Sequence, residues 1–197
     1  MPLVPLPKIP QEVSAAFQSQ WADFSDAEDP VQLPPADSPE YHAQRIFVLS
    51  PGELMGAGGL RTARAAGWRF LASGISSQYG IAASVAQRGN GWSLESVSYG
   101  PGIDVSLNAI RLLQPDLQAL PDVYELRVLK IPSLLTEAFW LLSPANSQLD
   151  RVVPYLTRLS GIEPTRKYSE HEFLSLIRPY AKKRLEYANS PRASGDR

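Results

Sequence analysis

Cysteine is absent from the 197 residues, and histidine and methionine occur only twice each. Without a thiol, the chain has no disulfide framework, no cysteine nucleophile and no cysteine-ligated metal. The two histidines, His42 and His171, lie outside the segments that we expect to form the core, and they do not predict a metal site. We therefore expect neither a metal nor a cofactor, and we expect a reducing compartment.

Long apolar runs are also missing. The strongest candidate, Ile131–Leu142, is shorter than the ~20 residues of a membrane span and contains Glu137. The first residues lack the charged-then-apolar pattern of a signal peptide. With 44% hydrophobic and 20% charged residues, the composition is typical of a soluble folded protein. We expect a cytoplasmic protein without membrane contact, and we take a bacterial source as a working assumption.

Positive charge is missing from one part of the chain. Between Ile9 and Gln44 there are seven acids and no lysine or arginine, whereas from Arg151 onward ten bases face five acids. Such asymmetry fits solvated ends, or a basic tail that lies against an acidic arm. The pI of about 6.1 does not favour nucleic-acid binding, and we do not expect a nucleic-acid partner.

Proline is concentrated where bases are missing, because eight of the eighteen prolines lie within residues 1–44. The opening segment favours a polyproline II arm, and the apolar spacing over Gln11–Trp21 predicts a short helix. Such an arm can lie on the chain's own apolar surface or on that of a partner. The residues that we expect to dock a partner are Leu3, Leu6, Ile9 and Trp21.

Ser50-Pro51-Gly52-Glu53 has the pattern of a capping box with proline in the first helical turn. Leu49 and Leu54 are spaced to form the hydrophobic staple. We predict a helix that runs from this cap through a glycine-weakened stretch to Ala66, where Gly67 ends it. A β region follows from Trp68.

Gly89-Asn90-Gly91 lies between two β-prone runs and predicts a hairpin, since Asn-Gly favours a type I′ turn. With Asn90-Gly91 as the loop, Val85 would lie opposite Ser96. One face of this hairpin is expected to be apolar and the other wetter. The residues expected on the apolar face are Ile81, Ala83, Val85, Trp92 and Leu94.

Further along, Ile103–Leu113 has helical spacing, and Pro115 is expected to end that helix. The dense apolar stretch Tyr124–Leu142 predicts strands. Its second half fits a strand or a helix, and we favour a strand. Ser169 begins a second capping box, and Pro179 is expected to kink or end the helix that follows.

These elements predict an α+β fold with a mainly antiparallel sheet of four to six strands, a packed helix, and flanking N- and C-terminal helices. We divide the chain into a proline-rich acidic arm with a short helix (1–44), an α+β core domain (45–165), and a C-terminal capped helix with a frayed tail (166–197).

No catalytic motif is complete. Gly56–Arg61 matches only half of a GxGxxG fingerprint, and Gly74–Gln78 lacks the second glycine of GxSxG. Glu125 and Glu137 could lie near each other on adjacent strands, with Arg127 beside Glu125, in a pocket between the sheet and the helix at 103–113. Alternatively, these charges form ion pairs on a solvated face.

The sequence therefore favours a non-enzymatic interaction or accessory protein that binds a protein partner or a second copy of itself. We assign no catalytic, cofactor-binding or metal-binding residue. The alternative is a small-molecule-binding protein or an enzyme that uses Glu125, Arg127 and Glu137.

Overall fold

The computed structural model describes residues 9–25, 42–72, 80–119 and 124–190, which form an α+β fold with a mostly antiparallel sheet. The elements are α1 (Gln11–Ser25), β1 (His42–Val48), α2 (Pro51–Met55), η1 (Gly59–Thr62), β2 (Arg64–Ala72), β3 (Ile81–Arg88), β4 (Gly91–Tyr99), α3 (Pro101–Ala119), β5 (Glu125–Ile131), η2 (Pro132–Leu134), β6 (Thr136–Leu142), η3 (Ser147–Leu149), β7 (Arg151–Leu156), β8 (Tyr168–Ser169) and α4 (Glu170–Asn189).

All eight described strands belong to one sheet with the order β4-β3-β2-β1-β5-β6-β7-β8. The prediction of four to six strands was too low. Neighbouring strands are antiparallel except β1 and β5, which run parallel and join the two halves of the sheet.

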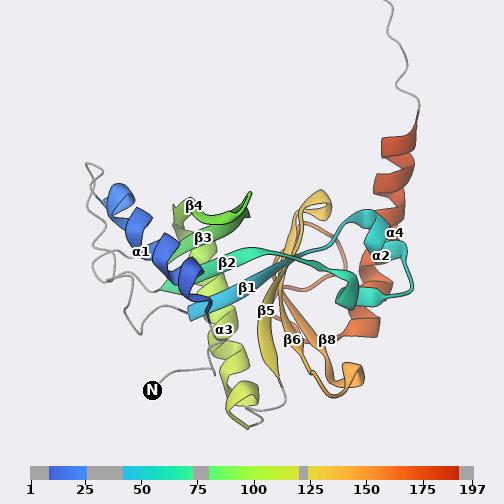
Figure 1. The fold of residues 1–197 in the computed structure, drawn as a ribbon. Coiled ribbons are helices and arrows are strands. Elements are labelled where there is room, and N and C mark those ends of the chain that lie inside the picture. Colours follow the sequence, from blue (N-terminus) through green and yellow to red (C-terminus); the bar gives the residue numbers. More distant parts are fainter. Residues whose placement is uncertain (1–8, 26–41, 73–79, 120–123, 191–197) are drawn as a thin grey trace, which may run out of the picture.

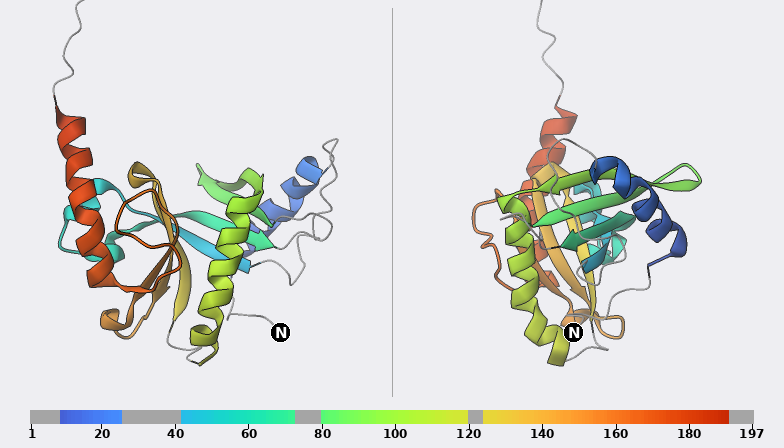
Figure 2. Two further views of the ribbon diagram at one scale, coloured as in Figure 1. Left: turned by 180° about the vertical axis from the view of Figure 1, so that it is seen from behind. Right: turned by 90° about the vertical axis from the view of Figure 1, so that its left-hand side faces the viewer.

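The helices cover both faces of the sheet (Figures 1 and 2). Helix α3 lies on one face, where buried residues of β1, β2, β5, β6 and β7 pack with it. Helix α1 covers the other face over β2, β3 and β4, and α2 and α4 cover that same face over β5 and β6. No helix in the described ranges has the length and apolar character that a membrane crossing would require.

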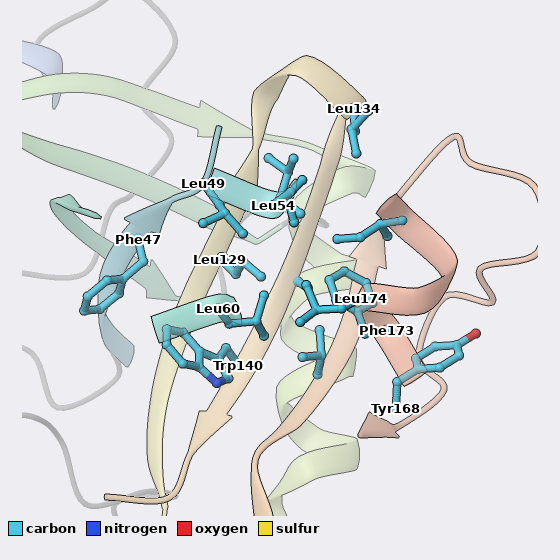
Figure 3. Packing of buried hydrophobic residues seen from close by; sticks show 14 of the residues in the cluster. Phe47, Leu49, Leu54, Leu60, Leu129, Leu134, Trp140, Tyr168, Phe173 and Leu174 are labelled. Atoms are coloured by element: carbon cyan, nitrogen blue, oxygen red, sulfur yellow. The ribbon is translucent and has the colours of Figure 1, made fainter. Parts of the chain in front are cut away.

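The largest cluster of buried residues lies between the sheet and the α2–α4 pair (Figure 3). Trp140 on β6 and Phe173 on α4 are almost inaccessible to solvent and lie in this cluster. Leu49 and Leu54, the predicted staple of α2, are fully buried in it, and both reciprocal hydrogen bonds of the Ser50 capping box are present.

Two predicted elements are confirmed in position. In α1, Val13, Phe17 and Trp21 are buried against the sheet, as their helical spacing indicated. The stretch that was ambiguous between strand and helix is strand β6.

The β3–β4 hairpin is confirmed, with Ile81, Ala83, Val85 and Leu94 on the buried face. However, its loop is Gly89-Asn90 rather than Asn90-Gly91, and Val85 pairs with Leu94 instead of Ser96. Gly89 has φ +57° and Asn90 is not at positive φ, a combination that fits a type II′ turn. Near the turn the register differs by two positions, so the side chains there keep their predicted faces. A β-bulge between Ser84 and Val85 then shifts the register by one, and Val97 pairs with Ala83 and packs against the buried face.

The helix predicted to reach Ala66 ends at Met55, and β2 begins at Arg64. The backbone leaves the helical conformation at Gly56, which is extended (φ −73°, ψ 165°). Gly59 then adopts φ +61°, and a side chain there would collide with the Glu170 carboxylate. The main-chain N–H of Leu60 donates a 2.7 Å hydrogen bond to that same carboxylate. The chain therefore turns at the glycines and is tied to the start of α4.

Neither proline ends its helix. Pro115 lies inside α3, and Pro179 lies inside α4. A helix-interior proline removes one hydrogen bond and costs ~3 kcal/mol. Buried side chains on both sides of each proline offset this cost, Leu113 and Leu117 in α3 and Ile177 and Ala181 in α4.

Candidate functional site

The turn between β5 and β6 presents an apolar side chain to solvent on a strained backbone. Leu135 follows η2 with φ 49° in the left-handed region, and it is 53% exposed. A non-glycine residue in this region costs on the order of 1 kcal/mol or more. Both features are unfavourable in the isolated chain, which makes this turn a candidate for function.

Three contiguous hollows surround Leu135. We call the first the β6–β7 pocket. It has a volume of about 490 Å³, and its lining is formed by Lys130, Pro132, Leu135, Thr136, Glu137, Leu156 and Arg158.

The other two hollows, which we call the α4 hollows, are each about 390 Å³ and lie between the turn and the C-terminal half of α4. They share Ser133, Leu135, Arg184 and Tyr187, while Arg158 and Lys183 line one of them.

The surface around the α4 hollows combines exposed apolar groups with bases. Tyr187 is 79% exposed and borders both hollows with Leu135. Arg158, Lys183 and Arg184 form no ion pair within the described part of the chain. No acidic residue stands among the described residues of the lining, and the described part of this surface is therefore positively charged.

A network of polar side chains reaches the β6–β7 pocket from the interior of the protein. Tyr155 donates a 2.7 Å hydrogen bond to Oε2 of Glu137 and accepts one of 2.7 Å from Nη1 of Arg69. Lys130 Nζ lies 3.3 Å from Oε1 of Glu137, and Arg69 Nη1 lies 3.5 Å from Oε2. Arg69 also reaches Ser106 on α3 at 3.4 Å.

The geometry of this network depends on a β-bulge. The register between β6 and β7 shifts between Glu137 and Ala138, which pair with Leu156 and Pro154 and leave Tyr155 as the extra residue. A bulge of this kind redirects a side chain, and here it directs Tyr155 toward Glu137. Pro154 has no N–H to contribute to the ladder, which favours a bulge at this position.

Burial raises the pKa of the Tyr155 hydroxyl well above its ordinary value. The charge of Arg69 lowers this pKa, whereas Glu137 raises it further. The phenol is therefore protonated at neutral pH, and it holds Glu137 in place as a hydrogen-bond donor.

The structure brings two of the three predicted pocket residues together and separates them from the third. Arg127 donates a 2.7 Å hydrogen bond to Glu125, and its guanidinium lies 4.3 Å from the centre of the Phe47 ring. Because side chains alternate along a strand, both point away from the α3 face, on which Leu126 and Val128 pack. Glu137 lies on the α3 face with Tyr155, and only Glu137 lines one of the hollows described here.

Two of the four residues predicted to dock a partner lie in the described part of the chain, and both pack against the protein's own core. Trp21 is 6% exposed and packs in the cluster beneath α1, with its ring 4.8 Å from that of Phe17. Ile9 is half-buried against the same cluster. Leu3 and Leu6 lie outside the described residues.

The two histidines lie far apart in the chain and in different elements. His42 begins β1, where burial and the charge of Arg111 lower its pKa below the ordinary value. His171 is exposed in the first turn of α4. Within the described ranges, no group of three or more histidine, aspartate or glutamate side chains is placed to hold a metal ion.

Sequence reasoning missed most of the residues around these hollows. One signal was available for Tyr155, because Pro154 inside an apolar strand indicates a bulge or an edge. The exposure of Leu135 and the burial of Arg69 had no such signal, since both depend on contacts between distant segments.

Comparison of the chain with protein families, with curated proteins and with solved structures finds no match.

Proposed function

We propose that this chain is a non-enzymatic interaction protein that binds an acidic, apolar segment of a protein partner on the α4 hollows. The observation that carries the proposal is the pairing of exposed Leu135 and Tyr187 with three bases that have no carboxylate partner among the described residues, namely Arg158, Lys183 and Arg184.

The apolar side chains of this surface would contact apolar groups of the partner, and its bases would contact acidic groups. Burial of the leucine and tyrosine side chains supplies affinity at roughly 25 cal/mol per Å² of apolar surface. Tyrosine and arginine are also the residue types that dominate binding hot spots. The bases attract acidic groups and accelerate encounter. An elongated segment suits the site because the two hollows share a wall at Leu135.

A second copy of the chain suits this surface less well. In a two-fold symmetric dimer the same patch faces itself, and each base would then approach the bases of the other copy. Like charges in an interface cost several kcal/mol. A partner with acidic groups avoids this repulsion.

The proposal can be tested with a fluorescein-labelled peptide rich in leucine and glutamate, whose anisotropy rises on binding. We expect Arg184→Glu to weaken binding by about tenfold, and Tyr187→Ala to weaken it by a similar factor. The matched control is Lys182→Glu, because Lys182 lies on the same helix, lines neither hollow and forms a 3.9 Å pair with Glu186.

Three results would contradict the proposal, and the first two concern charge. One is an equal loss in the Arg184 and Lys182 variants, which would mean that only the overall charge of the helix matters. The other is undiminished binding of a peptide with glutamine in place of every glutamate. Preferential binding of an oligonucleotide competitor would likewise replace the protein partner with a nucleic acid.

A further inference from the structure

We propose that the β6–β7 pocket is a second site, adjacent to the α4 hollows, that binds a small molecule with an apolar body and one carboxylate group. The pocket shares Pro132, Leu135 and Arg158 with those hollows, but this inference does not depend on the peptide-binding function, because the other walls differ. Lys130, Thr136, Glu137 and Leu156 line the pocket and neither of the α4 hollows.

The charges at the pocket leave an excess of positive potential. Glu137 is the one acidic residue among the described residues of its lining, and it interacts with two cations, Lys130 at 3.3 Å and Arg69 at 3.5 Å. Arg69 is only 5% exposed, so its charge is weakly screened by solvent. Arg158 adds a third positive charge in the lining and has no carboxylate partner among the described residues. Three positive charges therefore face one carboxylate, and a ligand anion would reduce the net charge at the pocket.

Hydrogen-bonding capacity identifies the residues that would hold this anion. Both oxygens of Glu137 already interact with donors, Oε2 with Tyr155 and Oε1 with Lys130. A lysine ammonium has three donors and an arginine guanidinium has five. Lys130 and Arg158 therefore retain unused donors, and they would bind a ligand carboxylate through charge-assisted hydrogen bonds.

The rest of the lining is suited to a hydrocarbon body. Leu135 and Leu156 are about half exposed, 53% and 52%, and Pro132 lies beside them. Thr136, although polar, uses its hydroxyl internally, 3.1 Å from the hydroxyl of Thr157 and 3.1 Å from the carbonyl of Leu134. The volume of about 490 Å³ lies within the range of small-molecule sites.

Octanoate is a suitable probe because it carries one carboxylate on an apolar chain, and octan-1-ol is its neutral counterpart. Both can be titrated into the full chain while backbone amide shifts are followed by NMR. We expect saturable octanoate binding with shifts centred on residues 130–137 and 156–158. Binding of octan-1-ol should be about three- to tenfold weaker, because it cannot form the charge-assisted bonds.

The sharpest test neutralises the lysine and the glutamate of the pocket in separate variants. Lys130→Gln should weaken octanoate binding about three- to tenfold, whereas Glu137→Gln should strengthen it, since the repelling carboxylate is removed and Lys130 is released. Arg184→Glu should leave octanoate binding unchanged, and Lys130→Gln should leave binding of the leucine- and glutamate-rich peptide unchanged. Failure of one proposal is thereby distinguishable from failure of the other.

The inference is overturned if octanoate does not bind saturably, or if octan-1-ol binds as tightly. Equal losses in Lys130→Gln and Arg184→Glu would also overturn it, because they would reduce the effect to the net charge of the protein. Circular dichroism of each variant establishes that the fold is intact before binding is compared.

Discussion

Tyr155 on β7 donates a hydrogen bond to Glu137 on β6 at the bulge in the pairing of these strands, and both side chains lie beside Arg69. The phenol hydroxyl is thus donor and acceptor at once. Its acceptor role matters because Arg69 is a buried cation, and a buried donor that loses its partner carries a desolvation cost.

Tyr155→Phe is therefore expected to lower the free energy of unfolding by about 1–3 kcal/mol, since it removes one hydrogen bond to each of two charged groups. Urea unfolding followed by tryptophan fluorescence measures the change. The matched control is Tyr180→Phe, whose hydroxyl bonds to Ser160 at an exposed position and should contribute less. Equal losses in the two variants would refute the importance of the Tyr155 network.

Asp150 should be another stability determinant, because its side chain is fully buried. It accepts hydrogen bonds from the Ser143 main chain at 2.7 Å, from Trp140 Nε1 at 3.3 Å and from Arg61 at 3.3 Å. Asp150→Asn removes the charge and turns an amide N–H₂ toward these donors. We expect a loss of about 2 kcal/mol in the free energy of unfolding.

Glu163→Gln is the corresponding control, because Glu163 is 71% exposed and pairs with Arg166 at 3.4 Å. Exposed pairs contribute about 0–1 kcal/mol. If both variants unfold at the same urea concentration, the Asp150 contacts do not stabilise the protein.

His42 predicts a pH dependence of stability. Its folded pKa lies below the ordinary value of 6.5, so the unfolded chain takes up a proton first as the pH falls. The contribution of neutral His42 to the free energy of unfolding is therefore fully present above pH 6.5. It is lost as the pH drops toward the folded pKa. His42→Gln should reduce the decline in stability between about pH 7 and pH 5.

The measurement for His42 is urea unfolding at several pH values. His171→Gln provides the same substitution at an exposed position. A steeper decline in the His42 variant than in the parent protein would have the opposite sign and would exclude this explanation.

Gln44 offers a stabilising substitution. It is 1% exposed, and neither atom of its side-chain amide has a hydrogen-bond partner within the described chain. Methionine has a similar shape and no polar group to desolvate, so Gln44→Met should raise the free energy of unfolding by about 1 kcal/mol. Gln87→Met, at an exposed position of β3, should change it little. Loss of stability in Gln44→Met would mean that the amide is hydrogen-bonded in solution.

Elements governed by local chemistry could be predicted from the sequence. The caps at Ser50 and Ser169 both accept the expected main-chain hydrogen bond, from Glu53 and Glu172. The β3–β4 hairpin was found because glycine and asparagine determine the turn within a few residues. In each case the information lies inside one short segment.

Elements governed by distant contacts could not be predicted. Strand β8 has two residues and exists because Tyr168 pairs with Val152. Pro115 and Pro179 lie inside helices because tertiary burial outweighs a local penalty. The number of strands and the ends of the helices therefore differ from the predictions.

Only one residue of the candidate site, Glu137, could be predicted from the sequence. The residues that interact with Glu137 could not. Arg69 and Tyr155 are 86 positions apart in the chain, and no periodicity connects them. Leu135 had the appearance of a core leucine in an apolar stretch, and only the turn after η2 places it outside. The division of the chain at residues 44 and 165 stays a prediction.

The parallel pairing of β1 with β5 has a consequence for how the molecule assembles. Antiparallel pairs of strands on either side can form by growth of the pairing from a turn. The β1–β5 pairing, which we call the seam, forms only when residues 45–48 meet residues 127–130, and this requires closure of a large loop. We therefore expect the two halves to gain structure early and their union to be the slow step. Substitutions at the seam would retard folding, and those at the outer ladders would mainly hasten unfolding.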